Sequence, residues 1–177
     1  RWPKLAELLS AQDIASVAVD LREGIESTLM IGGVQLSSRH DRAGEARLQA
    51  ASVAAEAPTV HLYGPGLGEL PFAFLQRPAL RRLEVRILNE TIFALVLHLI
   101  DQRAWLEDSR VSLSMASDDP EIHLPRFASP PELVLASDAN AKARDRLVAE
   151  AMVSVVNSRF SPDNAAFLAR FESNRSL

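Results

Sequence analysis

The chain contains no cysteine, and this absence excludes three kinds of chemistry together. None of the 177 residues can form a disulfide, bind zinc through a thiolate or act as a cysteine nucleophile. A chain without cysteine fits a reducing compartment, so we expect the protein to be cytoplasmic.

Long apolar runs are missing as well. The longest run, Ile92–Ile100, is interrupted by His98. It reaches about half of the roughly 20 residues that a membrane-spanning helix needs. We therefore expect no membrane span.

Positive charge is also scarce. The chain has 19 Lys and Arg residues against 23 Asp and Glu residues, so its net charge is −4. Proteins that bind nucleic acid usually present a basic surface that displaces counterions. The one basic cluster lies within Arg77–Arg86 and contains four arginines. We expect no nucleic-acid partner.

Glycine and proline are few, at 7 and 10 residues, while 47% of the chain is apolar and 24% is charged. This composition is typical of globular proteins and unlike disordered or collagen-like chains. The length suits one compact domain. Because the chain begins at Arg1, without Met or an apolar signal sequence, we expect a fragment of a longer protein.

The first part of the chain predicts a helix, a hairpin and a second helix. An amphipathic helix is expected near the start, followed by strand-like alternation from Ile14 to Leu21. Gly32 and Gly33 tolerate positive φ and predict a hairpin turn within Ser27–Ser37. A helix is then expected from the N-cap Asp41 to Ala57, where Pro58 stops it.

Strands and helices alternate from Thr59 to Met115, which predicts a parallel sheet with right-handed crossovers. After Met115 the alternation is less regular. We expect a loop over 117–131 with a possible short strand at Ile122–Leu124, a last strand at Glu132–Ala136 and a helix from Asp138 to Asn157. Ser161-Pro162-Asp163 predicts one more helix start. The alternating segments are a strand at 59–63, a helix at 67–75, a strand at 80–88, a helix at 90–99 and a strand at 110–115.

Together these elements predict one compact α/β domain. We expect a three-layer, Rossmann-like fold with a mainly parallel sheet, a small N-terminal β-hairpin and a C-terminal helical connector. Its parts are residues 1–58 (helix, hairpin and packing helix), 59–158 (the Rossmann-like core) and 159–177 (the connector). The centre of the sheet should bury Val60, Leu62, Val85, Ile87, Val111 and Leu113.

The most informative motif is a glycine turn, Gly64-Pro65-Gly66-Leu67-Gly68, between the first strand and helix of the predicted core. Its spacing is closer to the G-x-G-x-G of methyltransferase-like sheets than to the dinucleotide fingerprint. Glycines at Gly64, Gly66 and Gly68 would let backbone N–H groups approach a nucleotide or S-adenosylmethionine. The alternative is that these residues only form a tight strand-to-helix turn.

A nucleotide or S-adenosylmethionine site also needs a polar group at the end of the next strand. Glu84 lies about 20 residues after Gly64, the spacing expected for a ribose-binding acid, but falls inside the predicted strand. Asn89 stands at the strand end and would bind a ribose hydroxyl more weakly. Asp118 follows the third strand, together with Asp119 and Glu121, in a loop that either binds a ligand or is solvated.

No catalytic constellation and no metal site is evident. The four histidines, at positions 40, 61, 98 and 123, are scattered, and we interpret His61 and His98 as structural residues with satisfied hydrogen bonds. No Ser-His-Asp arrangement and no zinc-ligand spacing is present. We assign no catalytic residue and expect no resident cofactor.

Several stretches together resemble one known family. They are Val34–Ala46, with its Ser-rich turn and Glu-Ala helix start, the strand and glycine turn Val60–Gly68, the helix start Asn89–Phe93 with Leu99–Asp101, and the segment Phe160–Asn174. These stretches resemble the amino-terminal domain of the bacterial motility accessory factor (Maf) family, glycosyltransferases that decorate flagellin with nonulosonic acids.

The resemblance implies a non-catalytic N-terminal domain whose partners are the downstream catalytic domain of its parent protein and flagellin. Two features depart from the family: Ile87-Leu88 stands where the family often has Glu, and the catalytic glycine-rich nucleotide-sugar segment is absent. Two alternatives remain. One is a methyltransferase-like enzyme that binds S-adenosylmethionine or a nucleotide in the glycine turn, and the other is a ligand-free protein-interaction domain.

Overall fold

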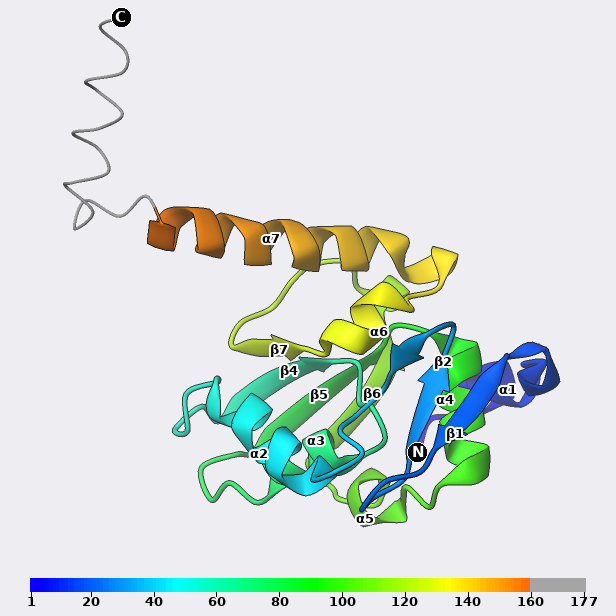
Figure 1. The fold of residues 1–177 in the computed structure, drawn as a ribbon. Helices are drawn as coiled ribbons and strands as arrows, with labels where there is room; N and C mark the ends of the chain where they lie inside the picture. The colour runs from blue at the N-terminus through cyan, green and yellow to red at the C-terminus, as the bar shows by residue number, and fades with distance from the viewer. Residues whose placement is uncertain (160–177) are drawn as a thin grey trace, which may run out of the picture. The chain divides into compact units, whose positions relative to one another are not determined.

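The computed structural model of the chain describes residues 1–159. Two compact units follow one another along the chain, Arg1–Arg144 and a second unit that begins at Asp145. Both sheets lie in the first unit (Figure 1). The predicted helix start at Ser161–Asp163 lies outside the described residues, as does all but the first residue of the predicted connector 159–177. No helix in residues 1–159 is long and apolar enough to cross a membrane.

Four parallel strands form the main sheet, in the order β6-β5-β4-β7. Helix α3 (Glu69–Leu75) connects β4 to β5, and α4 (Glu90–Leu99) lies between β5 and β6. The predicted α/β fold with a mainly parallel sheet is therefore confirmed. The strands are β4 (Thr59–Tyr63), β5 (Arg82–Ile87), β6 (Val111–Met115) and β7 (Arg126–Ala128).

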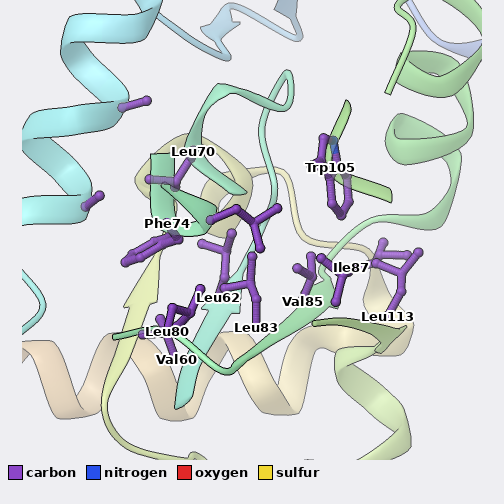
Figure 2. Packing of buried hydrophobic residues seen from close by; sticks show 14 of the residues in the cluster. Val60, Leu62, Leu70, Phe74, Leu80, Leu83, Val85, Ile87, Trp105 and Leu113 are labelled. Carbon is purple, nitrogen blue, oxygen red and sulfur yellow. The ribbon is translucent and has the colours of Figure 1, made fainter. Parts of the chain in front are cut away.

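One face of this sheet is apolar and carries the core. Val60 pairs with Leu83 and Leu62 with Val85, so their side chains lie on the same face. Figure 2 shows these side chains packed beneath Leu70, Phe74 and Trp105. All six residues predicted for the centre are buried: Val60, Leu62, Val85, Ile87, Val111 and Leu113.

The opposite face of the sheet is polar. His61 lies opposite Glu84, and Tyr63 lies opposite Arg86, while Ser112 and Ser114 continue the pattern on β6. Parallel strands with two apolar-covered faces are normally hydrophobic throughout. The strict alternation here instead gives the sheet one apolar face and one polar face.

The N-terminal part confirms the predicted hairpin and adds a strand to it. Gly32 and Gly33 have φ of +55° and +82°, as a tight hairpin turn requires. The alternation before the hairpin resolves into a short 3₁₀ turn and an edge strand. The elements are α1 (Pro3–Ser10), the 3₁₀ turn η1 (Ile14–Ser16), and the antiparallel strands β1 (Val19–Arg22), β2 (Thr28–Ile31) and β3 (Val34–Gln35).

Helix α2 (Arg42–Ala51) begins as predicted but ends earlier than Ala57. Asp41 caps its start, with Oδ1 accepting the Gly44 N–H at 2.6 Å. At its other end the Arg77 guanidinium donates to three carbonyls, those of Ala50, Val53 and Ala54. These bonds satisfy carbonyl groups that the early helix end leaves free.

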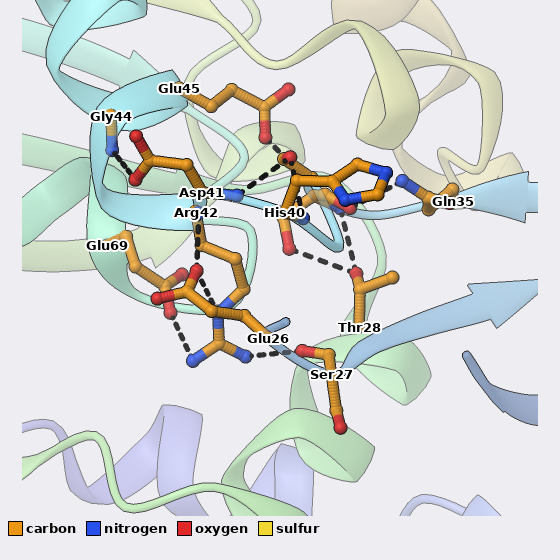
Figure 3. A network of polar contacts seen from close by, with 12 residues as sticks. Glu26, Ser27, Thr28, Gln35, His40, Asp41, Arg42, Gly44, Glu45 and Glu69 are labelled. Carbon is orange, nitrogen blue, oxygen red and sulfur yellow. Dashed lines mark hydrogen bonds and ion pairs between the residues drawn. The ribbon is translucent and has the colours of Figure 1, made fainter. Parts of the chain in front are cut away.

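A polar network attaches the hairpin to the helices (Figure 3). Arg42 forms an ion pair with Glu69 of α3 at 2.8 Å and donates to the Ser27 carbonyl at 2.8 Å. Glu26 accepts the Arg42 backbone N–H. A single arginine therefore links the hairpin, α2 and α3.

Two predictions for the later segments were wrong. The short strand β7 lies at Arg126–Ala128, not at Ile122–Leu124, and Glu132–Ala136 is not a strand. Helix α6 (Pro130–Val134) occupies that place because prolines in a first helical turn favour a helix start. The helix predicted from Asp138 to Asn157 is present as α7 (Ala141–Arg159), preceded by the 3₁₀ turn η3 (Asp138–Asn140). The remaining elements are α5 (Arg103–Leu106), with a buried Trp105, and the 3₁₀ turn η2 (Ala116–Asp118).

Candidate functional site

The sheet has one topological switch point, and it lies beside β4. From β4 the chain passes to β5 on one side, whereas β7 pairs with β4 on the other side. Open α/β sheets bind ligands in the crevice at the carboxyl ends of strands at such a point. The glycine turn follows β4 and helix α6 follows β7, and the Ser129 N–H donates to the Tyr63 carbonyl at 2.8 Å between them.

The backbone requires glycine at three positions of the turn. The φ angles are +85° at Gly64, +60° at Gly66 and +106° at Gly68, all in the left-handed region. Pro65 completes the turn by accepting the Gly68 N–H on its carbonyl at 3.2 Å. The motif therefore forms a tight strand-to-helix turn.

A carboxyl group of the same chain fills this turn. Oε2 of Glu132, on α6, accepts the Gly66 N–H at 2.5 Å, and the Glu132 residue is only 5% exposed. A Cβ atom on Gly64 would lie 2.5 Å from the same oxygen. The absence of a side chain at Gly64 thus makes room for Glu132, which uses the donor that a ligand phosphate or carboxylate would need.

Burial dominates the ionisation of Glu132 and raises its pKa to about 7. Hydrogen bonds from the Gly66 N–H and the Ser129 side chain oppose this rise. The Glu132 carboxyl group therefore keeps its proton at pH values at which an exposed glutamate is ionised.

The space beside Gly66 is small, whereas a cavity of about 480 Å³ lies on the other side of the turn and is lined in part by Leu67, Gly68 and Trp105. The cavity beside Gly66 measures about 20 Å³ and is lined in part by Gly66, Leu67 and Ser129. Such a volume holds about one water molecule. A nucleotide or S-adenosylmethionine that binds the Gly66 N–H requires Glu132 to leave the turn.

The turn is also supported by two side chains that the sequence did not single out. Gln102 donates to the Leu67 carbonyl at 2.9 Å and accepts the indole N–H of Trp105 at 2.5 Å. Both residues are buried. A Cβ atom on Gly68 would collide with the Gln102 side-chain oxygen, so close packing also selects glycine here.

The remaining predicted site residues serve other contacts. Glu84 lies in the middle of β5, as expected, and forms an ion pair with Arg82. Asn89 caps α4 by accepting the Ile92 N–H at 3.0 Å, and it donates to the Leu135 carbonyl at 2.6 Å. Asp118 accepts the Met115 N–H at 3.0 Å. The structure does not bring Glu84, Asn89 and Asp118 together around the turn.

A second polar cluster lies on the polar face of the sheet. Asp119 accepts from the buried Arg86 at 3.1 Å and contacts Nε2 of His123 at 2.8 Å. The His123 hydrogen bond is the main reason that the pKa of Asp119 is lowered. Tyr63, buried beside the cluster, accepts the His123 N–H at 3.3 Å.

His61 stacks on His123 with ring centroids 5.0 Å apart. Burial, followed by the charge of His123, lowers the pKa of His61. Its Nδ1 atom is buried and has no hydrogen-bond partner in the described part of the chain. We predicted that His61 is a structural histidine with satisfied hydrogen bonds, and this prediction was wrong for its Nδ1 atom.

No group of three or more metal-ligating side chains is assembled within residues 1–159. No protein-family model matches the chain, and no curated protein matches it. The assignment of function therefore depends on the sequence motifs and the geometry of the glycine turn.

Proposed function

We propose that this chain is a non-catalytic, Rossmann-like domain of a Maf-like glycosyltransferase that modifies flagellin with nonulosonic acid in the bacterial cytoplasm. In this proposal the domain positions the downstream catalytic domain or recognises flagellin. The observation that supports a non-catalytic role is the Glu132 carboxyl group in the glycine turn. It occupies the one place in the sheet where a nucleotide would be expected.

The surroundings of the turn support the same proposal. A ribose-binding site needs a free carboxylate or amide at the end of β5. Asn89, the polar residue at that end, already uses its oxygen to cap α4 and its amide to bond Leu135. The methyltransferase-like alternative would need both Glu132 and Asn89 to give up their present contacts.

The parent gene and its flagellin test the proposal directly. We expect the full-length gene product to carry a glycosyltransferase domain after this chain. Deleting the gene should lower the intact mass of flagellin by the mass of its nonulosonic acid residues, and complementation should restore it. Flagellin of the same mass with and without the gene would contradict the proposal.

The part played by this domain is tested by complementing the deletion with a parent gene that lacks residues 1–144. We expect flagellin to remain unmodified although the truncated protein accumulates, because the catalytic domain has lost its positioning partner. Full modification by the truncated protein would show that the domain is dispensable.

A further inference from the structure

Helix α6 is held against the glycine turn by one ionisable side chain. The helix consists of Pro130, Pro131, Glu132, Leu133 and Val134, so Glu132 is its one titratable residue. Its carboxyl group contacts the Gly66 N–H at 2.5 Å and the residue is 5% exposed. The Glu132 side chain fits here only because residue 64 is glycine. A Cβ atom at Gly64 would be too close to Oε2, Cδ and Cβ of Glu132.

Within the part of the chain that the structure describes, no cation compensates a negative charge at this position. Arg42 of α2 and Glu69 of α3 line the small cavity beside the turn, but they pair with each other at 2.8 Å. Glu45, also at this cavity, accepts the Ser38 N–H at 2.6 Å. Tyr63, at the end of β4, is engaged on the polar face, and β3 carries no titratable residue. An ionised Glu132 would therefore have only hydrogen bonds from Gly66 and Ser129 to replace its hydration.

We propose that Glu132 is a proton-dependent latch that keeps α6 closed over the Gly64–Gly68 turn. The neutral carboxyl group remains seated at little cost, whereas the ionised group gains hydration when it leaves. Deprotonation thus favours an open form in which the Gly66 N–H and the space beside Gly64 are exposed. Proton loss would thereby control how often α6 separates from the turn.

Amide hydrogen exchange, followed by NMR and corrected for intrinsic exchange rates, measures this opening. Two amides report it: Gly66, which bonds Glu132, and Leu133, which donates to the Ser129 carbonyl at 3.0 Å within α6. From the raised pKa we expect their opening constants to increase about 50-fold between pH 5 and pH 8. The Leu83 amide of β5, which donates to the Arg110 carbonyl at 3.0 Å, is the internal control for opening of the whole sheet.

Glu132→Gln is the decisive variant, because Gln keeps an oxygen for the Gly66 N–H but cannot ionise. Its opening constants at Gly66 and Leu133 should hardly vary with pH. Glu7→Gln, at an exposed position on α1, is the matched control and should behave as the wild type. Equal pH dependence in wild type and Glu132→Gln would overturn the proposal, as would opening that does not vary with pH in the wild type.

A measurement on the unmodified protein keeps the proposal testable if Glu132→Gln does not fold. Carbon-13 NMR of the Glu132 side-chain carboxyl follows its titration directly. We expect a midpoint near pH 7, with the Gly66 amide resonance titrating in parallel. A midpoint near the ordinary glutamate value of about 4.3 would overturn the latch.

Discussion

Gly64 and Glu132 are complementary in shape, although they lie 68 positions apart in the sequence (132 − 64). The glycine adopts a φ of +85°, and the space that its missing side chain leaves is occupied by the carboxyl group of Glu132. Oε2 of that group then bonds the N–H of Gly66, two residues further along the turn. One close contact thus joins the loop after β4 to the helix after β7.

This contact predicts that Gly64→Ala destabilises the protein more than Gly66→Ala. Both substitutions place alanine at positive φ, which costs about 1 kcal/mol or more. Only the Gly64 substitution adds a collision with Glu132, because nothing lies within 4 Å of a Cβ at Gly66. Urea denaturation should show a loss of about 1–2 kcal/mol for Gly66→Ala and about 3 kcal/mol or more for Gly64→Ala.

A double-mutant cycle with Glu132→Ala checks the cause of this difference. Removing the carboxyl group should relieve the contacts with Oε2 and Cδ of Glu132 but not the one with its Cβ, so Gly64→Ala should then cost less than it does in the wild type, though still more than Gly66→Ala. Additive effects of Gly64→Ala and Glu132→Ala would mean that the two residues do not contact one another in solution.

The buried carboxyl group also predicts how global stability varies with pH. The folded protein holds the Glu132 proton up to about pH 7, whereas the unfolded chain releases it near 4.5. Between these values the folded state binds more protons, so this group makes the free energy of unfolding decrease as pH rises, with no further change above the folded pKa. The total effect is up to about 3 kcal/mol.

The measurement is the free energy of unfolding of wild type and Glu132→Gln at several values between pH 4.5 and 8. The difference between the two proteins isolates Glu132 from His61. The lowered pKa of His61 acts in the opposite sense and makes stability increase as pH rises toward 6.5. Parallel curves for the two proteins would show that the Glu132 pKa is not raised.

Asn89 is predicted to be a structural cap and not a ribose ligand. Asn89→Ala loses the bond from Ile92 and the bond to Leu135, and should cost about 2 kcal/mol. Asn89→Asp keeps the cap but loses the donor to Leu135, so its cost should be smaller. Urea denaturation of both variants measures their free energies of unfolding and shows which variant is less stable. A decrease below about 0.5 kcal/mol for Asn89→Ala would contradict a capping role.

Gln102 is predicted to stabilise the turn from its other side. Gln102→Leu should leave the Leu67 carbonyl and the Trp105 indole N–H without their partners, at a cost of about 2–4 kcal/mol. Gln76→Leu, an exposed residue at the end of α3, is the control and should change stability by less than about 0.5 kcal/mol. Equal, small effects of the two substitutions would contradict the buried contacts of Gln102.

The sheet was predictable because its signals are local. Each strand from Thr59 to Met115 is a short run with apolar residues in alternation, and glycine, proline or polar residues separate it from the following helix. The bounds of β4 and α4 agree with the prediction residue for residue. Asp41 and Asn89 also follow the local rule for residues that begin helices.

The glycine turn was predictable as a turn, but its occupant was not. Glu132 follows two prolines and precedes an apolar run. Nothing within that segment indicates that its carboxyl group is buried, or that it binds Gly66, which lies 66 positions earlier in the sequence. Gln102 and Trp105 were missed for the same reason, since a polar connection contains them. Contacts between segments that are distant in sequence decide both cases.

The glycine turn is closed by the chain itself, and we expect it to bind no nucleotide or S-adenosylmethionine. Calorimetric titration of the wild-type protein with S-adenosylmethionine and with cytidine nucleotides tests it most directly. We expect no binding tighter than about millimolar, or roughly −4 kcal/mol, because Glu132 occupies the turn and Asn89 is committed to α4. Micromolar binding of S-adenosylmethionine would contradict a closed turn and favour a methyltransferase-like enzyme.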